Sequence, residues 1–351
     1  MTLIDLLNTL GRRKRLRAYG SISHGAATRL RLSTLIRFAG RRMVTASAGA
    51  PAVLLTCGDL GRALKDPDLL YRGMRFCVEE MGFDTFVLIA DLSLEAEACG
   101  CRLRFSERDL PMVIAHPVDA LTQIEDLSVP DPRRDGRMPV FLETMRRVAG
   151  DYTVLTAAVV TGPFTLAAHL RGTEIYRETI TDPERTKRLV AYCSRVGLTF
   201  ARALTEAGAD YIVLGEPSAS LLSPTAYQTF SQAYTEKEMR ALGVPCVLHI
   251  CGNTTHIVDK MWHSGAVAIS VDEVDLPAVA RSAPEDVVLM GSISPATLLT
   301  CSPGAVRERT IGVLDSLSER RAFMVLPGCD LAPETPMENI QAYVTAVRGY
   351  A

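Results

Sequence analysis

The sequence predicts an α/β fold, namely a (β/α)8 TIM barrel, over most of its 351 residues. Three observations lead to this prediction. From residue 51 onward, eight short apolar runs alternate with longer helical stretches. Several runs are continuously apolar, as expected for strands that are buried on both faces of a parallel sheet. Eight such units match a closed barrel, and an open doubly wound sheet is the main alternative.

The expected elements follow in chain order. The strands are 52–56, 85–90, 152–159, 210–214, 246–250, 267–271, 287–290 and 322–326. The main helices are 67–81, 139–148, 183–207, 224–242, 254–264, 303–317 and 335–347. Several helices begin at or beside a proline, which suits the first helical turn. The stretch 91–137 interrupts the alternation, and we expect it to be an insertion with two short strands, 102–105 and 112–114. No Gly-x-Gly-x-x-Gly follows the first predicted strand, which argues against a dinucleotide-binding fold.

Residues 1–50 form an atypical basic segment ahead of a single domain at 51–351. No Asp or Glu occurs between Leu6 and Gly58, and ten Arg or Lys residues fall in that stretch. A basic arm, an organelle transit segment, and a disordered or frame-shifted segment are all compatible with this composition.

Bulk properties narrow the class of protein. The formal net charge is −2, which suggests neither nucleic acid nor an anionic membrane as a partner. No apolar run approaches about 18 residues, so we expect no transmembrane helix. Nine scattered cysteines suit a reducing cytosol, and we expect a cytoplasmic protein whose thiols pack in the core or bind metal. The sequence does not predict an oligomeric state.

The most informative residues are His249, Cys251 and Cys329. His249 and Cys251 close one predicted strand, and Cys329 follows another in a Pro-Gly-Cys turn. In an extended chain, residues two apart point to the same side, so His249 and Cys251 can reach one ion. If the two strands share a sheet, one imidazole and two thiolates converge with a fourth position left open, which is typical of a catalytic zinc. A core cysteine with a hydrogen-bonded histidine is the alternative.

Two carboxylates at other strand ends are candidate catalytic residues. Asp91 fits a general acid/base or a substrate anchor, and equally a helix cap. Glu216 fits a fourth metal ligand, an acceptor for the histidine N–H, or a carboxylate that stabilises a helix N-terminus. Polar groups at many strand ends favour a pocket on that rim of the barrel.

Segments 248–255 and 327–339 resemble the methylcobamide:coenzyme M methyltransferases of the uroporphyrinogen decarboxylase superfamily. Segments 161–165, 206–210, 223–224 and 291–295 are also similar, and the likeness runs from about residue 66 to the C-terminus. The resemblance implies a (β/α)8 barrel with Zn2+ held by His249, Cys251 and Cys329. It further implies transfer of a methyl group between a methylated corrinoid, carried by a small partner protein, and a thiol such as coenzyme M. The residues expected to line the corrinoid site are Thr161, Gly162, Asn253, Asp272, Gly291 and Ser292.

Three other functions stay open within this resemblance. A corrinoid-dependent demethylase of methoxylated or halogenated methyl donors would use the same zinc site. A uroporphyrinogen decarboxylase would use no metal, and Asp91 stands where its aspartate is expected. A non-catalytic corrinoid-protein binding module would keep docking without turnover, because the family pattern breaks near Gly11.

Overall fold

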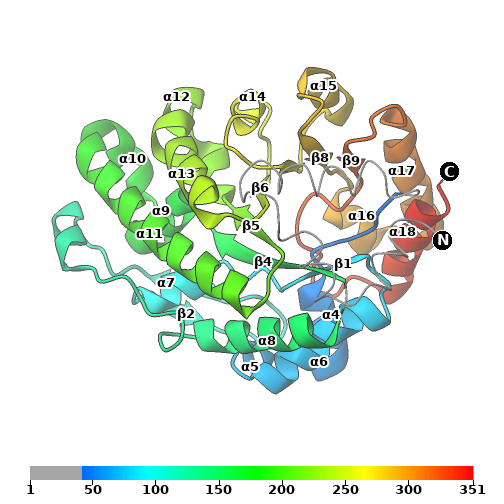
Figure 1. Ribbon diagram of the computed structural model, residues 1–351, viewed down its shortest axis with the longest axis horizontal. Helices are drawn as coiled ribbons and strands as arrows, with labels where there is room; N and C mark the ends of the chain where they lie inside the picture. The colour runs from blue at the N-terminus through cyan, green and yellow to red at the C-terminus, as the bar shows by residue number, and fades with distance from the viewer. Residues whose placement is uncertain (1–41, 153, 351) are drawn as a thin grey trace.

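Seven parallel strands form one curled sheet in the computed structural model, which describes residues 42–152 and 154–350 (Figure 1). The strands are β1 (Thr85–Val87), β4 (Leu155–Thr161), β5 (Tyr211–Gly215), β6 (Cys246–Ile250), β7 (Ala268–Val271), β8 (Val288–Met290) and β9 (Phe323–Met324). They neighbour one another in that order, and every pair is parallel. Their carboxyl ends therefore share one rim, and the predicted TIM-barrel class is confirmed.

The extended segment 42–48 lies between β1 and the loop after β9. The Asp84 N–H donates to the Val44 carbonyl over 2.8 Å, and the Leu331 N–H donates to the Ser47 carbonyl over 2.9 Å. The Met43 side chain packs in the same buried cluster as inward-facing residues of β4 to β9. This segment therefore completes the barrel wall in the place where the sequence analysis expected a strand at 52–56.

The predicted strand at 52–56 is wrong, because these residues lie in helix α4 (Gly49–Cys57). A short apolar run has the same composition in a buried helix as in a buried strand, so its periodicity cannot separate the two. Helix α4 packs closely on α6 (Pro67–Glu79). A Cβ on Gly73 would stand 2.5 Å from a methyl carbon of Val53, so the absent side chain permits this approach.

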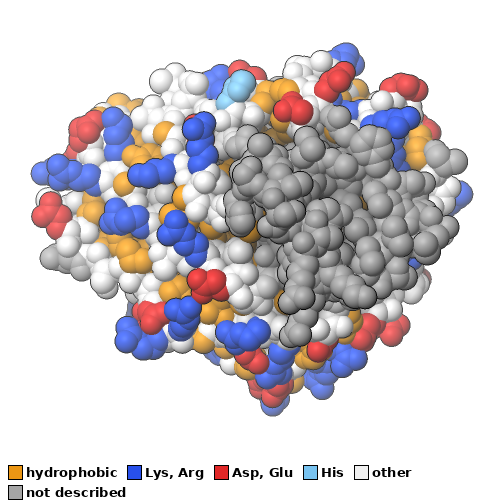
Figure 2. Space-filling model, viewed as in Figure 1, with side chains coloured by type: hydrophobic (Ala, Val, Ile, Leu, Met, Phe, Trp, Pro, Cys, Tyr) orange, Lys and Arg blue, Asp and Glu red, His pale blue; other side chains and the backbone are white. Residues whose placement is uncertain are grey.

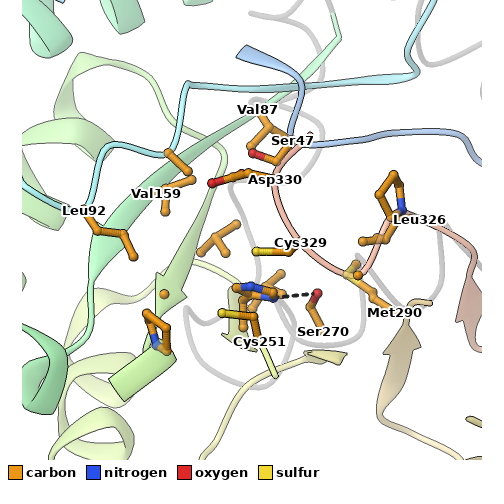
Figure 3. Close-up of a pocket in the computed structure, with 18 of the residues that line it drawn as sticks. Ser47, Val87, Leu92, Val159, Cys251, Ser270, Met290, Leu326, Cys329 and Asp330 are labelled. Atoms are coloured by element: carbon orange, nitrogen blue, oxygen red, sulfur yellow. Dashed lines mark hydrogen bonds between the residues drawn. The ribbon is translucent and has the colours of Figure 1, made fainter. Parts of the chain in front are cut away.

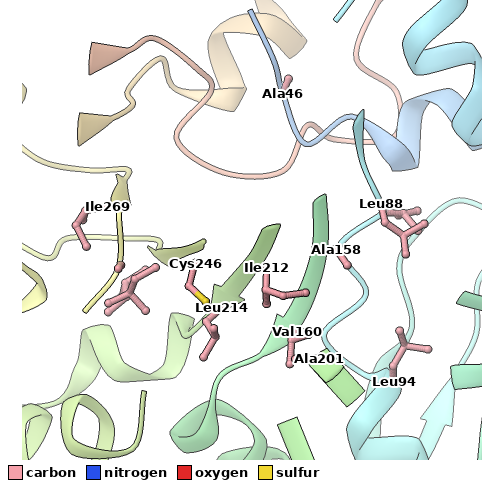
Figure 4. Packing of buried hydrophobic residues seen from close by; sticks show 14 of the residues in the cluster. Ala46, Leu88, Leu94, Ala158, Val160, Ala201, Ile212, Leu214, Cys246 and Ile269 are labelled. Carbon is pink, nitrogen blue, oxygen red and sulfur yellow. The ribbon is translucent and has the colours of Figure 1, made fainter. Parts of the chain in front are cut away.

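Helices cover the outer face of the sheet (Figures 1 and 4). Several of the longer ones lie close to their predicted bounds: α8 (Met138–Asp151), α11 (Pro183–Ala207), α17 (Pro303–Ser316) and α18 (Met337–Arg348). The predicted helix 224–242 is divided into three consecutive helical segments that end with α13 (Ala233–Leu242), and the predicted helix 254–264 is shorter than expected. Shorter ones are α5 (Leu60–Ala63), α9 (Pro163–Arg171), α10 (Glu174–Thr181), α12 (Pro224–Tyr227), α14 (Val258–Met261), α15 (Leu276–Ser282) and α16 (Pro295–Thr300). Irregular helical segments are η1 (Leu121–Asp126), η2 (Pro217–Leu221) and η3 (Gln228–Gln232). Outward-facing strand residues such as Val160, Ile212 and Leu214 are fully or almost fully buried beneath these helices.

The insertion after β1 contains α7 (Leu94–Ala98) and an antiparallel pair, β2 (Arg102–Arg104) with β3 (Met112–Ala115), as the sequence predicts. The predictions for residues 1–41 lie outside the described residues, whereas positions 42–50 pack in the barrel wall and in α4. All nine cysteines are free thiols. None of the helices that the structure describes combines the length and apolar character needed to span a bilayer.

Charged side chains of both signs intermix over the visible face, most clearly along α6 and α8 (Figure 2). Arg147 on α8 contacts both Glu143 on its own helix and Asp68 on α6, and Arg75 pairs with Glu79 over 3.0 Å. Such exposed pairs contribute little stability individually, about 0–1 kcal/mol each. The mixed surface agrees with the near-neutral formal charge of −2.

Candidate metal centre

His249, Cys251 and Cys329 converge at the carboxyl-end rim of the barrel (Figure 3). His249 lies in β6, Cys251 follows that strand by one residue, and Cys329 lies in the loop after β9. One ring nitrogen and two sulfur atoms all lie within 4.8 Å of one another. Residues that are 78 positions apart in the chain thus form one group that could hold a metal ion. Their ligation of a metal stays a prediction.

Ser270 fixes the orientation of the histidine ring. Its hydroxyl oxygen lies 3.0 Å from His249 Nδ1, and the two residues are direct neighbours in the register of β6 and β7. With Nδ1 engaged in this way, Nε2 is the ring nitrogen left to face the two cysteines. The sequence analysis missed Ser270. Its signal was a single hydroxyl inside the otherwise apolar run 268–271, whose partner depends on register between strands.

The two thiols and the imidazole perturb one another. The hydrogen bond between the thiols lowers the pKa of Cys251 and raises that of Cys329, and burial raises the latter further. Burial also lowers the pKa of His249. The hydrogen bond and charge of Cys329, with the charges of Asp330 and Asp272, outweigh that effect and leave the pKa above its ordinary value. These groups therefore compete for protons at close range, and a cation among them would favour both thiolates.

Asp272 joins the Cys251 loop to the loop after β8 and lies against the Cys329 loop at Gly328. Its Oδ2 accepts a hydrogen bond of 3.1 Å from the Gly252 N–H, and its carbonyl oxygen accepts one of 2.5 Å from the Ser292 hydroxyl. A Cβ on Gly328 would stand 2.2 Å from Asp272 Oδ1, so only glycine fits there. Gly291 has φ 138°, and a Cβ on it would stand 2.7 Å from a β7 carbonyl oxygen. These predicted corrinoid-lining residues thus hold the rim in shape, and their contact with a corrinoid stays a prediction.

Glu216 is fully buried and stabilises the N-terminus of helix α9. Its Oε1 accepts from the Phe164 N–H at 2.8 Å and from the Ser231 hydroxyl at 2.9 Å, and its Oε2 accepts from the Thr165 N–H at 2.9 Å. Burial raises the pKa of Glu216, and these donors oppose the rise. A Cβ on Gly162 would stand 2.3 Å from Oε2. Glu216 therefore takes the helix-stabilising role that the sequence left open, while the histidine partner is Ser270.

Two further predicted lining residues have protein partners. Thr161 donates from its N–H to Glu95 over 2.8 Å and from its hydroxyl to the same carboxylate over 2.7 Å. Burial raises the pKa of Glu95 to about 7, against these hydrogen bonds. Asn253 is exposed, and its side-chain oxygen accepts from the Thr255 N–H over 3.0 Å. Neither Thr161 nor Asn253 lines the cavity that is described below.

Asp91 lies in a buried ion-pair network. Arg137 donates to Asp91 over 2.6 Å and to Glu97 over 2.7 Å, and the Ser93 hydroxyl donates to Asp91 over 2.5 Å. The guanidinium also stacks over the ring of Phe105. Asp91 does not line the cavity described below, and its neighbour Leu92 does. In the structure Asp91 therefore joins the two ends of the insertion 91–137 through Arg137, and its role as an acid/base or substrate anchor stays a prediction.

A cavity of about 130 Å³ adjoins the three converging side chains (Figure 3). His249, Cys251 and Cys329 line it, together with Ser270, Asp330 and Ser47. Its remaining wall comes from inward-facing apolar residues of the strands, including Val87, Val159, Val213, Val247 and Met290, and from Leu326 just after β9. The three donors therefore face a largely apolar space at the barrel mouth.

The uroporphyrinogen decarboxylase family model matches residues 39–350. The chain belongs to the uroporphyrinogen decarboxylase family. Within that family, it is 30% identical to methylcobamide:CoM methyltransferase MtbA of Methanosarcina acetivorans over 77% of this chain and 81% of that protein. It is 29% identical to uroporphyrinogen decarboxylase of Sorangium cellulosum over 76% of this chain and 79% of that protein.

A solved methyltransferase from Methanosarcina mazei has the same fold. Its TM-score is 0.83 and its identity 25%, over 91% of this chain and 97% of that one. The family model begins at residue 39, close to the extended segment that completes the barrel. Together, these relatives support an enzyme with methyltransferase activity.

Proposed function

We propose that this protein is a zinc-dependent methyltransferase that moves a methyl group between a corrinoid, held on a small partner protein, and a thiol. The observation that carries the proposal is the convergence of His249, Cys251 and Cys329 within 4.8 Å beside an apolar cavity. The names of the relatives support the reaction class. Coenzyme M is named for those relatives, and for this chain it is one candidate thiol.

The donor set fits zinc. Two thiolate sulfurs at about 2.3 Å and one imidazole nitrogen at about 2.0 Å from a tetrahedral ion would lie roughly 3.5–3.8 Å apart. The upper limit of 4.8 Å between the donor atoms is close to that spacing. Three protein ligands leave a fourth position for substrate, which is typical of catalytic rather than structural zinc. When bound, zinc would supply the positive charge that keeps an incoming thiol deprotonated at neutral pH.

The residues of the chain would hold and position the reactants. Ser270 orients the His249 ring, and Asp272 holds the loop that carries Cys251. The apolar wall excludes water from the thiolate, which strengthens it as a nucleophile. A sulfur–carbon bond then forms as the carbon–cobalt bond of the corrinoid substrate breaks. Both electrons of that bond stay on cobalt, and the thiol proton leaves to solvent.

The reverse direction, demethylation of a methyl donor, uses the same side chains. Uroporphyrinogen decarboxylation is supported by the family as a whole and by relatives such as the S. cellulosum enzyme. Against it, the Asp91 carboxylate that this reaction would need is already held by Arg137 and Ser93. Metal content separates the two reactions. A binding module without turnover would bind zinc and leave methylcobalamin intact.

The test measures zinc per chain together with thiol-dependent loss of the methyl–cobalt absorption of methylcobalamin. We expect about one zinc per chain in the wild-type protein, and loss of both zinc and activity in the double variant Cys251→Ala/Cys329→Ala. Cys301→Ala is the matched control, because Cys301 is also a half-buried free thiol but lies outside the group of three. A wild-type protein that demethylates methylcobalamin equally well without zinc would refute the proposal.

A further inference from the structure

Cys329 lies beside the seam of the barrel, where segment 42–48 meets the residues that follow β9. Strands β1 and β9 are the two ends of the seven-stranded order, so the strand ladder does not close on itself. The extended segment 42–48 fills the gap, and none of its residues belongs to a strand. One residue of the candidate metal centre is therefore carried by a loop whose support comes from single hydrogen bonds.

Segment 42–48 is fixed on its β1 side. The Val44 N–H donates to Asp84 Oδ2 over 2.8 Å, and the Asp84 N–H donates back to the Val44 carbonyl over 2.8 Å. The Thr85 hydroxyl donates to the Thr45 hydroxyl over 2.7 Å. These bonds hold the segment as the first wall of the barrel, but they do not involve the Cys329 loop.

Tyr343 joins the segment to the β9 side of the seam. This tyrosine of α18 is fully buried. Its hydroxyl lies 2.7 Å from the Thr45 carbonyl oxygen and 3.0 Å from the Val325 carbonyl oxygen. Val325 directly follows β9 and stands four residues before Cys329. One hydroxyl therefore bridges the seam at the start of the loop that carries Cys329.

A second contact crosses the seam just beyond Cys329. The Leu331 N–H donates to the Ser47 carbonyl over 2.9 Å, and the Ser47 side chain donates to the Asp330 carboxyl. Ser47 and Asp330 line the same cavity as Cys329 (Figure 3). Segment 42–48 thus holds the loop on both sides of the cysteine.

We propose that Tyr343 is a positioning residue of the metal centre, and that closure of the seam and binding of the metal stabilise each other. This inference rests on the proposed function, because it takes Cys329 as a metal ligand. A loop held at both ends keeps the Cys329 sulfur near the other two donors, so less ordering is left for the binding step. A bound ion would in turn tie the loop to β6, because such coupling is reciprocal.

The first test measures zinc affinity by competition with a chromogenic chelator. Tyr343→Phe removes the bridging hydroxyl and keeps the ring, and we expect the affinity to fall about 3–30-fold. Tyr192→Phe is the matched control. Tyr192 is also buried and donates to a backbone carbonyl, that of Ser128, over 2.8 Å, but it joins α11 to the insertion. Unchanged affinity in a folded Tyr343→Phe protein, or an equal loss in Tyr192→Phe, would overturn the inference.

The second test is amide hydrogen exchange in the metal-free protein, which separates a local effect from a general loss of stability. The Leu331 N–H reports on the seam, and the Ile212 N–H, bonded to the Pro245 carbonyl over 3.0 Å, reports on the sheet. We expect Tyr343→Phe to speed exchange at Leu331 by at least about threefold relative to Ile212. Equal acceleration at both amides would show that the tyrosine is merely structural.

The wild-type protein tests the coupling without any variant, including the case in which Tyr343→Phe does not fold. The Asp84 N–H bonds segment 42–48 on the side away from the three donors. We expect zinc to slow exchange at Asp84 by at least about threefold relative to Ile212. Exchange at Asp84 that does not respond to bound zinc would contradict the coupling.

Turnover separates this inference from the proposed function. Methyl transfer from methylcobalamin, with a zinc affinity that is insensitive to Tyr343→Phe, would refute the positioning role and leave the methyltransferase intact. The expected changes in zinc affinity and exchange, without methyl transfer, would refute the methyltransferase and leave the positioning role intact.

Discussion

Two halves of the barrel rim carry buried polar side chains, but they use them differently. Near the ends of β1 and β5, the carboxylates of Asp91 and Glu216 each accept two or more hydrogen bonds from protein donors, and Glu95 of α7 accepts two from Thr161 at the end of β4. At the ends of β6 and β9, His249 and the two cysteines face one another beside a cavity. Both groups therefore lie at the same rim of the barrel.

The partners of each group account for the difference. A buried carboxylate that receives an arginine or several N–H groups is stabilised as part of the framework, and its lone pairs are no longer free for a ligand. Two thiols and an imidazole provide few donors for one another, so the most favourable partner for the set is a soft cation. A polar residue at the rim of a barrel therefore indicates a reactive site only once its partners are known.

The largest expected effect is on the framework half. Arg137→Met leaves the buried carboxylate of Asp91 and the half-buried carboxylate of Glu97 without their cation. Removing one partner of such a buried pair costs about 3–5 kcal/mol in the free energy of unfolding. Urea denaturation measures this loss, and zinc content per folded chain should stay near that of the wild type. A loss below about 1 kcal/mol would show that the buried carboxylates in this half of the rim do not depend on Arg137 for stability.

The pH dependence of stability tests Glu95. Burial raises its pKa to about 7 in the folded state, above the ordinary value of 4.5. The protonated form is therefore favoured by folding, and its contribution is full below about pH 4.5 and is lost as the pH rises through 7. Relative to Glu95→Gln, we expect the wild-type free energy of unfolding to fall across this window, by up to about 1.4 kcal/mol per pH unit. Parallel curves for the two proteins would contradict the expectation.

Substitution of Ser270 should weaken zinc binding less than substitution of a metal ligand does. Ser270→Ala removes the hydrogen bond that orients the His249 ring and leaves all three donors in place. Loss of such a partner weakens metal binding by about 10–100-fold. Competition with a chromogenic zinc chelator measures the affinity. Ser316→Ala is the control, because this exposed serine on α17 bonds only to a carbonyl of its own helix. An unchanged zinc affinity in Ser270→Ala would show that this serine does not support metal binding.

The smallest expected effect is that of removing an exposed ion pair. The substitution is of the same kind as Arg137→Met and serves as its control. Arg133 pairs with Glu206 over 2.8 Å, but both side chains are largely exposed, at 73% and 65%. Exposed pairs contribute about 0.2–1 kcal/mol, so Arg133→Met should change the urea midpoint very little. A destabilisation as large as that of Arg137→Met would show that burial does not explain the contrast.

Local patterns in the sequence predicted most of the barrel. The α11 bounds follow directly from Asp182 and Pro183 at its start and Gly208 at its end, which are local signals. The first strand was missed because the run 52–56 has an apolar composition that a buried helix shares. The segment that replaces it, 42–48, has little strand character and is held by partners elsewhere in the chain.

The candidate site likewise contains some residues that local sequence patterns predicted and others that they did not. His249, Cys251 and Cys329 were found because their spacing and strand-end positions are visible in the chain. The partners of Asp91 and Glu216 were not found, because Arg137 lies 46 residues beyond Asp91 and the α9 backbone 51–52 residues before Glu216. The helix-stabilising role of Glu216 was one of three alternatives that the sequence left open. Ser270 was missed for the related reason that its partner is set by the register of two strands. Contacts of this kind appear only once the insertion and the sheet are assembled.

X-ray absorption at the zinc edge tests the central claim most directly. For the zinc-loaded protein, the account predicts two sulfur ligands at about 2.3 Å and one imidazole nitrogen at about 2.0 Å, with a third sulfur appearing when a thiol substrate such as coenzyme M is added. A zinc shell that lacks sulfur, or one that already holds four protein ligands and does not change on addition of the thiol, would contradict it.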